Sequence, residues 1–223
     1  MDFSELTPPE LRVLGCLIEK RWTTPDNYPL SLNALRLACN QARNRDPVTE
    51  YDEQTVREAA ERLSRYGLAR PASGRSSRSV KYRDLAEEGL DLDREELAVL
   101  AVLLLRGSQT PGELKARGER MAPIGSLEEV EQVLERLIDR GYVRRIGRRA
   151  RQKEDRFVHV LGDSGVADLA VAEAEVGTQP QPLTIDETLD HGPSVLERIA
   201  ALEDEMEALR LEVAQQRAER DAR

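Results

Sequence analysis

Basic side chains gather in two short stretches, and their type and spacing suggest a chemical role. Between Arg65 and Arg83 there are six basic residues and no acidic one, and between Arg140 and Arg156 there are eight against two acidic ones. Such cations can pair with the phosphates of duplex DNA, which supply most non-specific affinity. The alternative is solvated stretches whose arginines cover apolar surface or bind an acidic part of the chain. The candidate nucleic-acid-binding residues are Arg70, Arg75, Arg78, Lys81, Arg83, Arg144, Arg145, Arg148, Arg149, Arg151 and Lys153.

Residues suited to catalysis or metal binding are sparse. The only histidines are His159 and His191, and Cys16 and Cys39 lie within helical apolar patterns, so no Cys/His cluster has metal-ligand spacing. No glycine-rich phosphate loop follows a predicted strand, and no nucleophile elbow occurs. We therefore expect a binding protein that is not an enzyme and that holds no metal and no cofactor.

A polar stretch at residues 40–48 is the second candidate site. Loops of this kind on a rigid scaffold often carry binding, so we expect it to contact a partner. The alternative is a self-packed loop, fixed by hydrogen bonds from its side chains to nearby backbone. The partner-binding candidates are Asn40, Gln41, Arg43, Asn44 and Arg45.

These residues belong to one pattern that occurs twice. The openings of the two copies are 86 positions apart (Leu11 to Leu97) and their ends 74 apart (Leu63 to Leu137), so the first copy has 12 extra residues in its middle. The polar stretch at 40–48 accounts for that excess. Each copy predicts three helices and then a basic hairpin, which is the order of a winged helix-turn-helix domain. The predicted fold class is mainly α with small β-hairpins (α+β).

Local signals set the expected boundaries. Thr7, Ser31 and Asp52 are N-cap candidates for the helices of the first repeat, and Gly67 ends the third. In the second repeat the helices are expected at about 93–106, from Thr110, and from Ser126 to about Arg140. The first hairpin should return through 79–83, with Val80 and Tyr82 alternating against Lys81 and Arg83, and the second should pair 142–146 with 156–161.

The formal net charge of −9 is unevenly distributed. Residues 1–90 hold 14 basic against 14 acidic residues, residues 91–162 hold 14 against 13, and the remaining 61 hold 5 against 15. We divide the chain into winged-helix domains at 1–88 and 89–162, a flexible acidic linker at 163–193 and a short coiled coil at 194–217.

Apolar residues within the predicted coil recur at spacings of 4, 3, 4, 3 and 4, as in a heptad seam. The seam predicts a parallel homodimer. The alternative is a helix that folds back on its own domains. The predicted dimerisation residues are Val195, Ile199, Leu202, Met206, Leu209 and Val213.

Two motifs resemble the YceH-like proteins, a bacterial family of unassigned function. One runs from Thr24-Pro-Asp-Asn-Tyr-Pro-Leu-Ser-Leu-Asn-Ala-Leu to Asn44-Arg-Asp-Pro-Val48, and the other is Arg106-Gly-Ser-Gln-Thr-Pro-Gly-Glu-Leu114. The resemblance covers residues 5 to about 162. It implies tandem winged-helix domains and leaves the activity open.

Two functions remain open at this point. The leading hypothesis is a DNA-binding protein, of the transcription-regulatory kind, that uses its basic wings, with duplex DNA as partner. The alternative is a winged-helix adaptor that binds proteins. The third helices weaken the DNA hypothesis, because residues 52–65 hold four acidic against three basic residues and residues 126–140 hold five against two.

The longest apolar run, Leu97 to Leu105, has nine residues, about half of the ~20 that span a bilayer. The opening residues lack the basic and apolar regions of a secretory signal. We expect a cytoplasmic protein with no membrane partner.

Overall fold

The computed structural model describes residues 3, 5–72, 80–146 and 154–162, and the structural statements below concern these residues. The predicted linker and coiled coil, including all six seam residues, lie outside this range. The hairpin candidates Arg75, Arg78, Arg148, Arg149, Arg151 and Lys153 also lie outside it.

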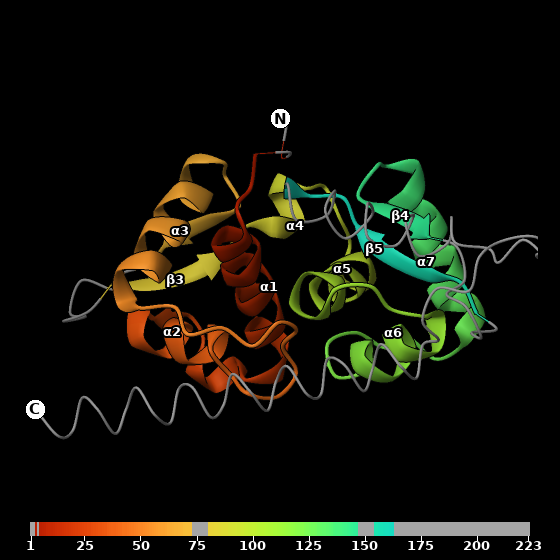
Figure 1. Cartoon of the computed structure of the whole chain (residues 1–223), viewed down its shortest axis with the longest axis horizontal. Helices are drawn as coiled ribbons and strands as arrows, with labels where there is room; N and C mark the ends of the chain where they lie inside the picture. The colour runs from red at the N-terminus through yellow and green to blue at the C-terminus, as the bar shows by residue number, and fades with distance from the viewer. Residues whose placement is uncertain (1–2, 4, 73–79, 147–153, 163–223) are drawn as a thin grey trace, which may run out of the picture. The chain divides into compact units, whose positions relative to one another are not determined.

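The described part is a mixed α and β structure with seven α-helices and five short strands in antiparallel sheets (Figure 1). The first repeat comprises α1 (Pro8–Thr23), the 3₁₀ turn η1 (Pro25–Asn27), β1 (Leu30–Ser31), α2 (Leu32–Cys39), α3 (Glu53–Arg65), β2 (Ala69–Pro71) and β3 (Lys81–Asp84). The second comprises α4 (Ala86–Gly89), α5 (Arg94–Arg106), α6 (Pro111–Gly118), α7 (Leu127–Asp139), β4 (Val143–Ile146) and β5 (Arg156–His159). None of the helices described is long and apolar enough to cross a membrane.

The predicted helix starts are confirmed. The Ser31 hydroxyl accepts the Ala34 N–H at 3.3 Å, and the Asp52 carboxylate accepts the Thr55 N–H at 2.7 Å. Each bond satisfies a donor that the first helical turn leaves free. Gly67 follows α3 with a φ of +72°, in the left-handed region that glycine enters at little cost.

The first repeat contains a three-stranded sheet of order β1-β3-β2, and the second a two-stranded sheet of β4 and β5. Tyr82 lies opposite Leu30 and is buried. Val80, in contrast, is 48% exposed. Val80 precedes the first paired residue of β3, so no neighbouring strand covers it. The two-residue strand β1 was not anticipated, because it is too short to show alternation.

Helices α1 and α5 form the most extensive contact between any two elements and lie next to each other between the remaining helices (Figure 1). Leu14 and Leu17 of α1 and Leu100 and Leu103 of α5 are fully buried in the same apolar cluster. Gly15 allows the close approach, since a Cβ built there would lie 3.0 Å from two carbons of the Leu105 side chain. The first helices of the two repeats thus build a common core.

Candidate functional site

The predicted basic residues that the structure describes lie on the hairpin strands. Arg70 on β2 and Arg144 on β4 are exposed, and Lys81 and Arg83 on β3 are partly exposed. Within the described ranges these four cations have no ion-pair partner. Arg145 differs, because its guanidinium stacks 5.4 Å from the Phe157 ring centre and pairs with Asp155 at 3.8 Å.

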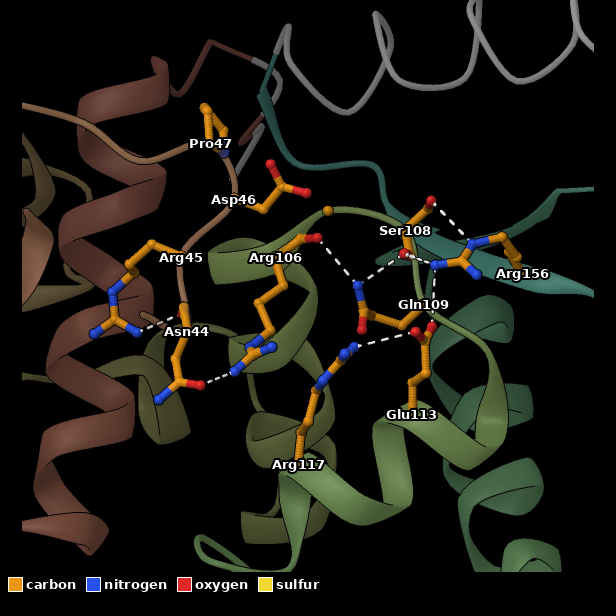
Figure 2. Close-up of a pocket in the computed structure, with 11 residues that line it drawn as sticks. Asn44, Arg45, Asp46, Pro47, Arg106, Ser108, Gln109, Glu113, Arg117 and Arg156 are labelled. Carbon is orange, nitrogen blue, oxygen red and sulfur yellow. Dashed lines mark hydrogen bonds and ion pairs between the residues drawn. The ribbon is translucent and has the colours of Figure 1, made fainter. Parts of the chain in front are cut away.

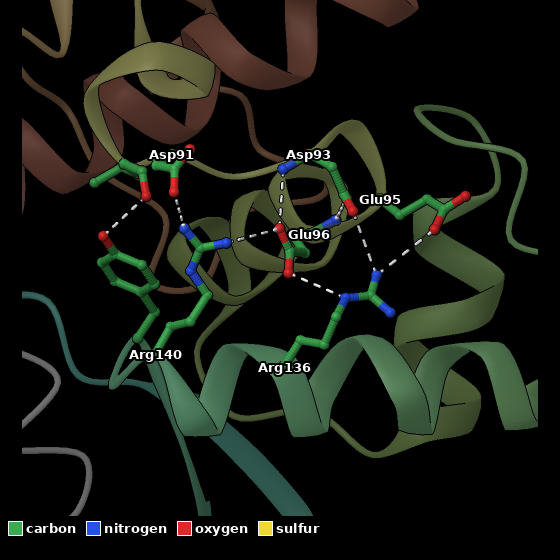
Figure 3. A network of polar contacts seen from close by, with 8 residues as sticks. Asp91, Asp93, Glu95, Glu96, Arg136 and Arg140 are labelled. Atoms are coloured by element: carbon green, nitrogen blue, oxygen red, sulfur yellow. Dashed lines mark hydrogen bonds and ion pairs between the residues drawn. The ribbon is translucent and has the colours of Figure 1, made fainter.

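Arg136 of α7 and Arg140 at its C-cap pair with acids at and before the start of α5, although both remain partly exposed to solvent (Figure 3). Arg136 pairs with Glu96 at 3.2 Å and with Asp93 at 3.4 Å, both at the start of α5. Arg140 pairs with Asp91 at 2.6 Å. Glu96 is 2% exposed and also accepts the Asp93 N–H in a capping box. These bonds use the cations of α7 to hold α7 against α5.

Most of the other exposed side chains of α7 are acidic. Glu128, Glu131, Glu135 and Asp139 are all exposed. Glu129 is exposed as well, but its carboxylate accepts the Gly125 N–H at 2.7 Å and so closes the preceding turn.

Beside these acids lies a groove of about 340 Å³ between α7, the start of α6 and the second hairpin. Four of its nine lining residues are acidic and one is basic. The lining residues are Pro111, Gly112, Leu127, Glu131, Glu135, Arg145, Glu154, Asp155 and Phe157, and we call them the α7 groove.

The corresponding helix of the first repeat, α3, carries charges of both signs. Arg57 pairs with Glu53 at 2.9 Å along the helix. Arg62 pairs with the buried Glu10 of α1 at 2.5 Å. Arg65 is exposed at the end of the helix.

Two residues of the 40–48 loop hold the loop in place. The Asn40 side chain donates to the Tyr51 carbonyl at 2.7 Å and accepts the Tyr51 N–H at 2.8 Å. The Arg45 side chain is fully buried, pairs with Glu19 at 2.7 Å and donates to the Ala38 carbonyl. Burial alone would raise the pKa of Glu19, but the hydrogen bond and charge of Arg45 outweigh it and lower the pKa. Asn40 and Arg45 therefore fit the alternative interpretation, in which side chains of the loop fix it by bonding to nearby backbone.

The rest of the loop faces outward or toward the second repeat. Arg43 is exposed and Gln41 is partly exposed. Asn44, with a φ of +65°, accepts a hydrogen bond from Arg106 at the end of α5. A backbone hydrogen bond also connects the loop to α5, because the Asp46 N–H donates to the Leu105 carbonyl at 2.8 Å.

The loop and the second repeat enclose a polar pocket of about 420 Å³ (Figure 2). Four arginines and two acidic residues line it. We call it the junction pocket, and its lining residues are Asn44, Arg45, Asp46, Pro47, Arg106, Gly107, Ser108, Gln109, Glu113, Arg117 and Arg156.

Internal bonds occupy part of this lining. Arg156 donates to the Ser108 carbonyl at 2.5 Å and to the Glu113 carboxylate at 3.0 Å. Glu113 also caps α6 by accepting the Thr110 N–H at 3.0 Å. Burial would raise the pKa of Glu113, but the Thr110 N–H and the charges of Arg156 and Arg117 lower it. This acid is satisfied by the protein itself.

Arg106 sits among other cations. Burial lowers its pKa, and the nearby charges of Arg117, Arg120 and Arg45 lower it further. Both effects disfavour the guanidinium cation, so an anion placed beside Arg106 would relieve them. The junction pocket is suited to bind negative charge.

His159 is buried, and no group of three or more His, Cys, Asp or Glu side chains within the described part of the chain could hold a metal ion. Cys16 and Cys39 are free thiols and are buried in α1 and α2.

Comparison with known proteins gives a consistent family assignment. The family described as "Protein of unknown function, DUF480" matches residues 6–152. The chain belongs to this family. It is 43% identical to a UPF0502 protein of Solibacter usitatus over 94% of this chain and 95% of that relative. UPF0502 proteins of Pelobacter propionicus and Serratia proteamaculans are 47% and 44% identical, each over 92% of this chain and over 90% and 95% of the relative. The uncharacterised bacterial family inferred from the sequence motifs is confirmed.

The two motifs that carried the resemblance meet in this DUF480 chain. Residues 44–47 come from the first motif and residues 106–109 and 113 from the second, and all of them line the junction pocket. The sequence predicted Asn44 and Arg45 as binding residues, but it did not indicate Arg106, Gln109, Arg117 and Arg156 as pocket residues. Because the motifs lie 62 positions apart (Asn44 to Arg106), no local pattern indicated that they meet.

Proposed function

We propose that this DUF480 protein is a tandem winged-helix binding protein with no reaction of its own, and that its second repeat docks a basic segment of a partner protein. The order of three helices and a hairpin in each repeat supports the winged-helix interpretation, and in the first repeat β1 adds a third strand to the hairpin. Winged-helix domains serve protein contact as well as DNA binding, so the site decides the function.

The acidic face of α7 carries the proposal. A helix in the major groove lies between two rows of phosphates and reads bases mainly with Arg, Asn and Gln. Glu128, Glu131 and Glu135 would instead meet the phosphates with like charge, because Arg136 and Arg140 are turned toward α5. The same carboxylates would attract lysine and arginine side chains of a protein.

The α7 groove adds shape to this charge. Leu127 is 52% exposed at the rim, and Phe157 lies in the wall. The exposed leucine can contact an apolar side chain of a partner, while the surrounding acids pair with flanking cations. The favoured partner is thus a protein segment in which basic residues flank an apolar one.

Duplex DNA is the second candidate, and the hairpins favour it. Arg70, Lys81 and Arg83 have no acidic partner among the described residues and lie on neighbouring strands. Such cations can contact phosphates without any helix in the groove. Homodimerisation and a cytoplasmic location remain part of the proposal.

One pair of variants separates the two candidates. The first neutralises the face of α7 (Glu128→Gln, Glu131→Gln, Glu135→Gln, Asp139→Asn), and the matched control neutralises the first hairpin (Arg70→Gln, Lys81→Gln, Arg83→Gln). We expect a protein captured from nuclease-treated extract of the native cells to bind the purified wild type and the hairpin variant. We expect the α7 variant not to bind this captured protein.

Duplex binding is measured on the same proteins as gel retardation at low salt. DNA binding replaces the adaptor proposal if the wild type retards duplex with an affinity that falls with salt, and if the hairpin variant lowers the log–log slope by about one unit per lost phosphate contact. An α7 variant that keeps every captured protein also contradicts the adaptor proposal.

A further inference from the structure

We propose that the junction pocket binds a small phosphomonoester that carries hydroxyl groups near its phosphate. This site shares no lining residue with the α7 groove and includes none of the hairpin residues proposed to contact DNA, so the inference goes beyond the proposed function and does not depend on it.

Two arginines of the pocket have more N–H donors than the described protein groups accept. A guanidinium has five N–H donors. Arg106 donates to the Asn44 side chain, and among the described residues Arg117 is paired only with Glu113, at 3.5 Å. Since Glu113 is already held by the Thr110 N–H and Arg156, it leaves much of the charge of Arg117 uncompensated. Figure 2 shows both guanidinium groups pointing into the pocket, while the Asp46 carboxylate points away from them.

Gln109 presents an acceptor to the same space. Its amide nitrogen donates to the carbonyls of Arg106 and Ser108, at 3.0 and 2.8 Å, and these two bonds fix which end of the amide is nitrogen. The side-chain oxygen is buried and has no hydrogen-bond partner among the described residues, and the whole residue is 4% exposed. In Figure 2 this oxygen points toward the gap between Arg106 and Arg117. A buried acceptor without a donor is unfavourable, so the ligand should supply one.

The required ligand therefore combines negative charge with a hydrogen-bond donor. Phosphomonoesters meet both conditions, because their second pKa lies near 6 and a fraction stays protonated at neutral pH. Sulfate has a similar shape but carries no proton at that pH. The pocket, at about 420 Å³, lies within the range of about 300–1,000 Å³ that is typical of small-molecule sites. This space accommodates a hydroxylated carbon skeleton as well as the phosphate.

Isothermal titration calorimetry at constant ionic strength tests the site on the full chain, with ribose 5-phosphate, inorganic phosphate and sulfate as probes. We expect binding in the order ribose 5-phosphate, phosphate, sulfate. Arg117→Gln should weaken the binding of ribose 5-phosphate by about 10-fold or more, because a hydrogen bond between charged groups is lost. Arg120→Gln is the matched control, since Arg120 lies close by but does not line the pocket. It should stay within about twofold of the wild type.

A second variant tests the donor requirement. Gln109→Met keeps the length of the side chain and removes the acceptor, so it should reduce the preference for phosphate over sulfate. Thermal melting without ligand shows whether each variant is folded. The inference is overturned if the wild type binds no phosphorylated probe at 10 mM, if both arginine variants weaken binding equally, or if the folded wild type binds sulfate as well as phosphate.

Discussion

Ion pairs stabilise two buried charged residues of this protein. Arg45 pairs with Glu19, and Glu96 pairs with Arg136. Breaking such pairs leaves an uncompensated buried group, which typically costs about 3–5 kcal/mol. His159 has no such partner. Burial lowers its pKa to about 4, although a hydrogen bond with the backbone of Leu161 opposes the shift, and its Nδ1 atom has no partner among the described residues.

This pKa predicts a loss of stability on acidification. The unfolded histidine takes up a proton below pH 6.5 and the folded one only near pH 4, so the unfolded state binds more protons between these values. The free energy of unfolding should fall as pH is lowered through this window, by up to about 3 kcal/mol from this residue. Urea unfolding of the wild type and of His159→Gln at pH 7 and pH 4.5 isolates the contribution. Equal pH dependence of the two proteins contradicts it.

At the scale of elements, the packing of α1 on α5 joins the two repeats. Gly15 is the residue of α1 that faces α5 without a side chain, and Leu104 and Leu105 occupy the space that a side chain would need. Well-packed interiors tolerate added atoms poorly, because neighbouring side chains must leave favourable rotamers.

Gly15→Val should therefore destabilise the protein by about 1–3 kcal/mol, despite the poor helix propensity of glycine. Gly112→Ala in α6 is the control, because a Cβ there would meet only the Thr110 hydroxyl oxygen at 4.0 Å. This control should be neutral or stabilising by up to about 1 kcal/mol. Chemical denaturation measures both, and a Gly15→Val protein as stable as the wild type would show that α1 and α5 can separate without cost.

At the scale of the whole molecule, contacts between distant segments connect the two repeats. The Gly162 N–H, beyond β5, donates to the Phe3 carbonyl at 3.1 Å, and the Asp46 N–H donates to the Leu105 carbonyl. Residues of both repeats belong to one apolar cluster. We expect the two repeats to unfold together, since unfolding of one repeat would expose the apolar residues that the other contributes to this cluster.

The predicted coiled coil at 194–217 lies outside the described residues, and a truncation tests it. Deleting residues 194–223 should abolish a weak, concentration-dependent dimer and leave the melting temperature of the monomer unchanged. The buried seam must carry the association, since exposed ion pairs contribute only tenths of a kcal/mol each. Sedimentation equilibrium gives the mass. If the truncated chain is as dimeric as the full one, the dimer does not depend on the coil.

Local rules made much of the secondary structure predictable. N-caps such as Ser31 and Asp52, the C-terminal Gly67 and the apolar periodicity act within a few residues, so they can be interpreted from the sequence alone. The two-fold repeat, the mixed α and β class and the family followed from such patterns. The exposure of Val80 could not be predicted in this way, because it depends on where the neighbouring strands end, and one of them, β1, is distant in the sequence.

Only the tertiary structure decided which polar residues remain available to a partner. Residues 126–140 contain five acids and two arginines, but the packing of α7 against α5 pairs both arginines with acids at or before the start of α5 and leaves the carboxylates of α7 in solvent. Packing of α1 on α5 likewise brings Asn44 to Arg106 and encloses Gln109. These outcomes depend on contacts between residues far apart in the chain, whose positions follow from burying apolar surface and not from any local preference.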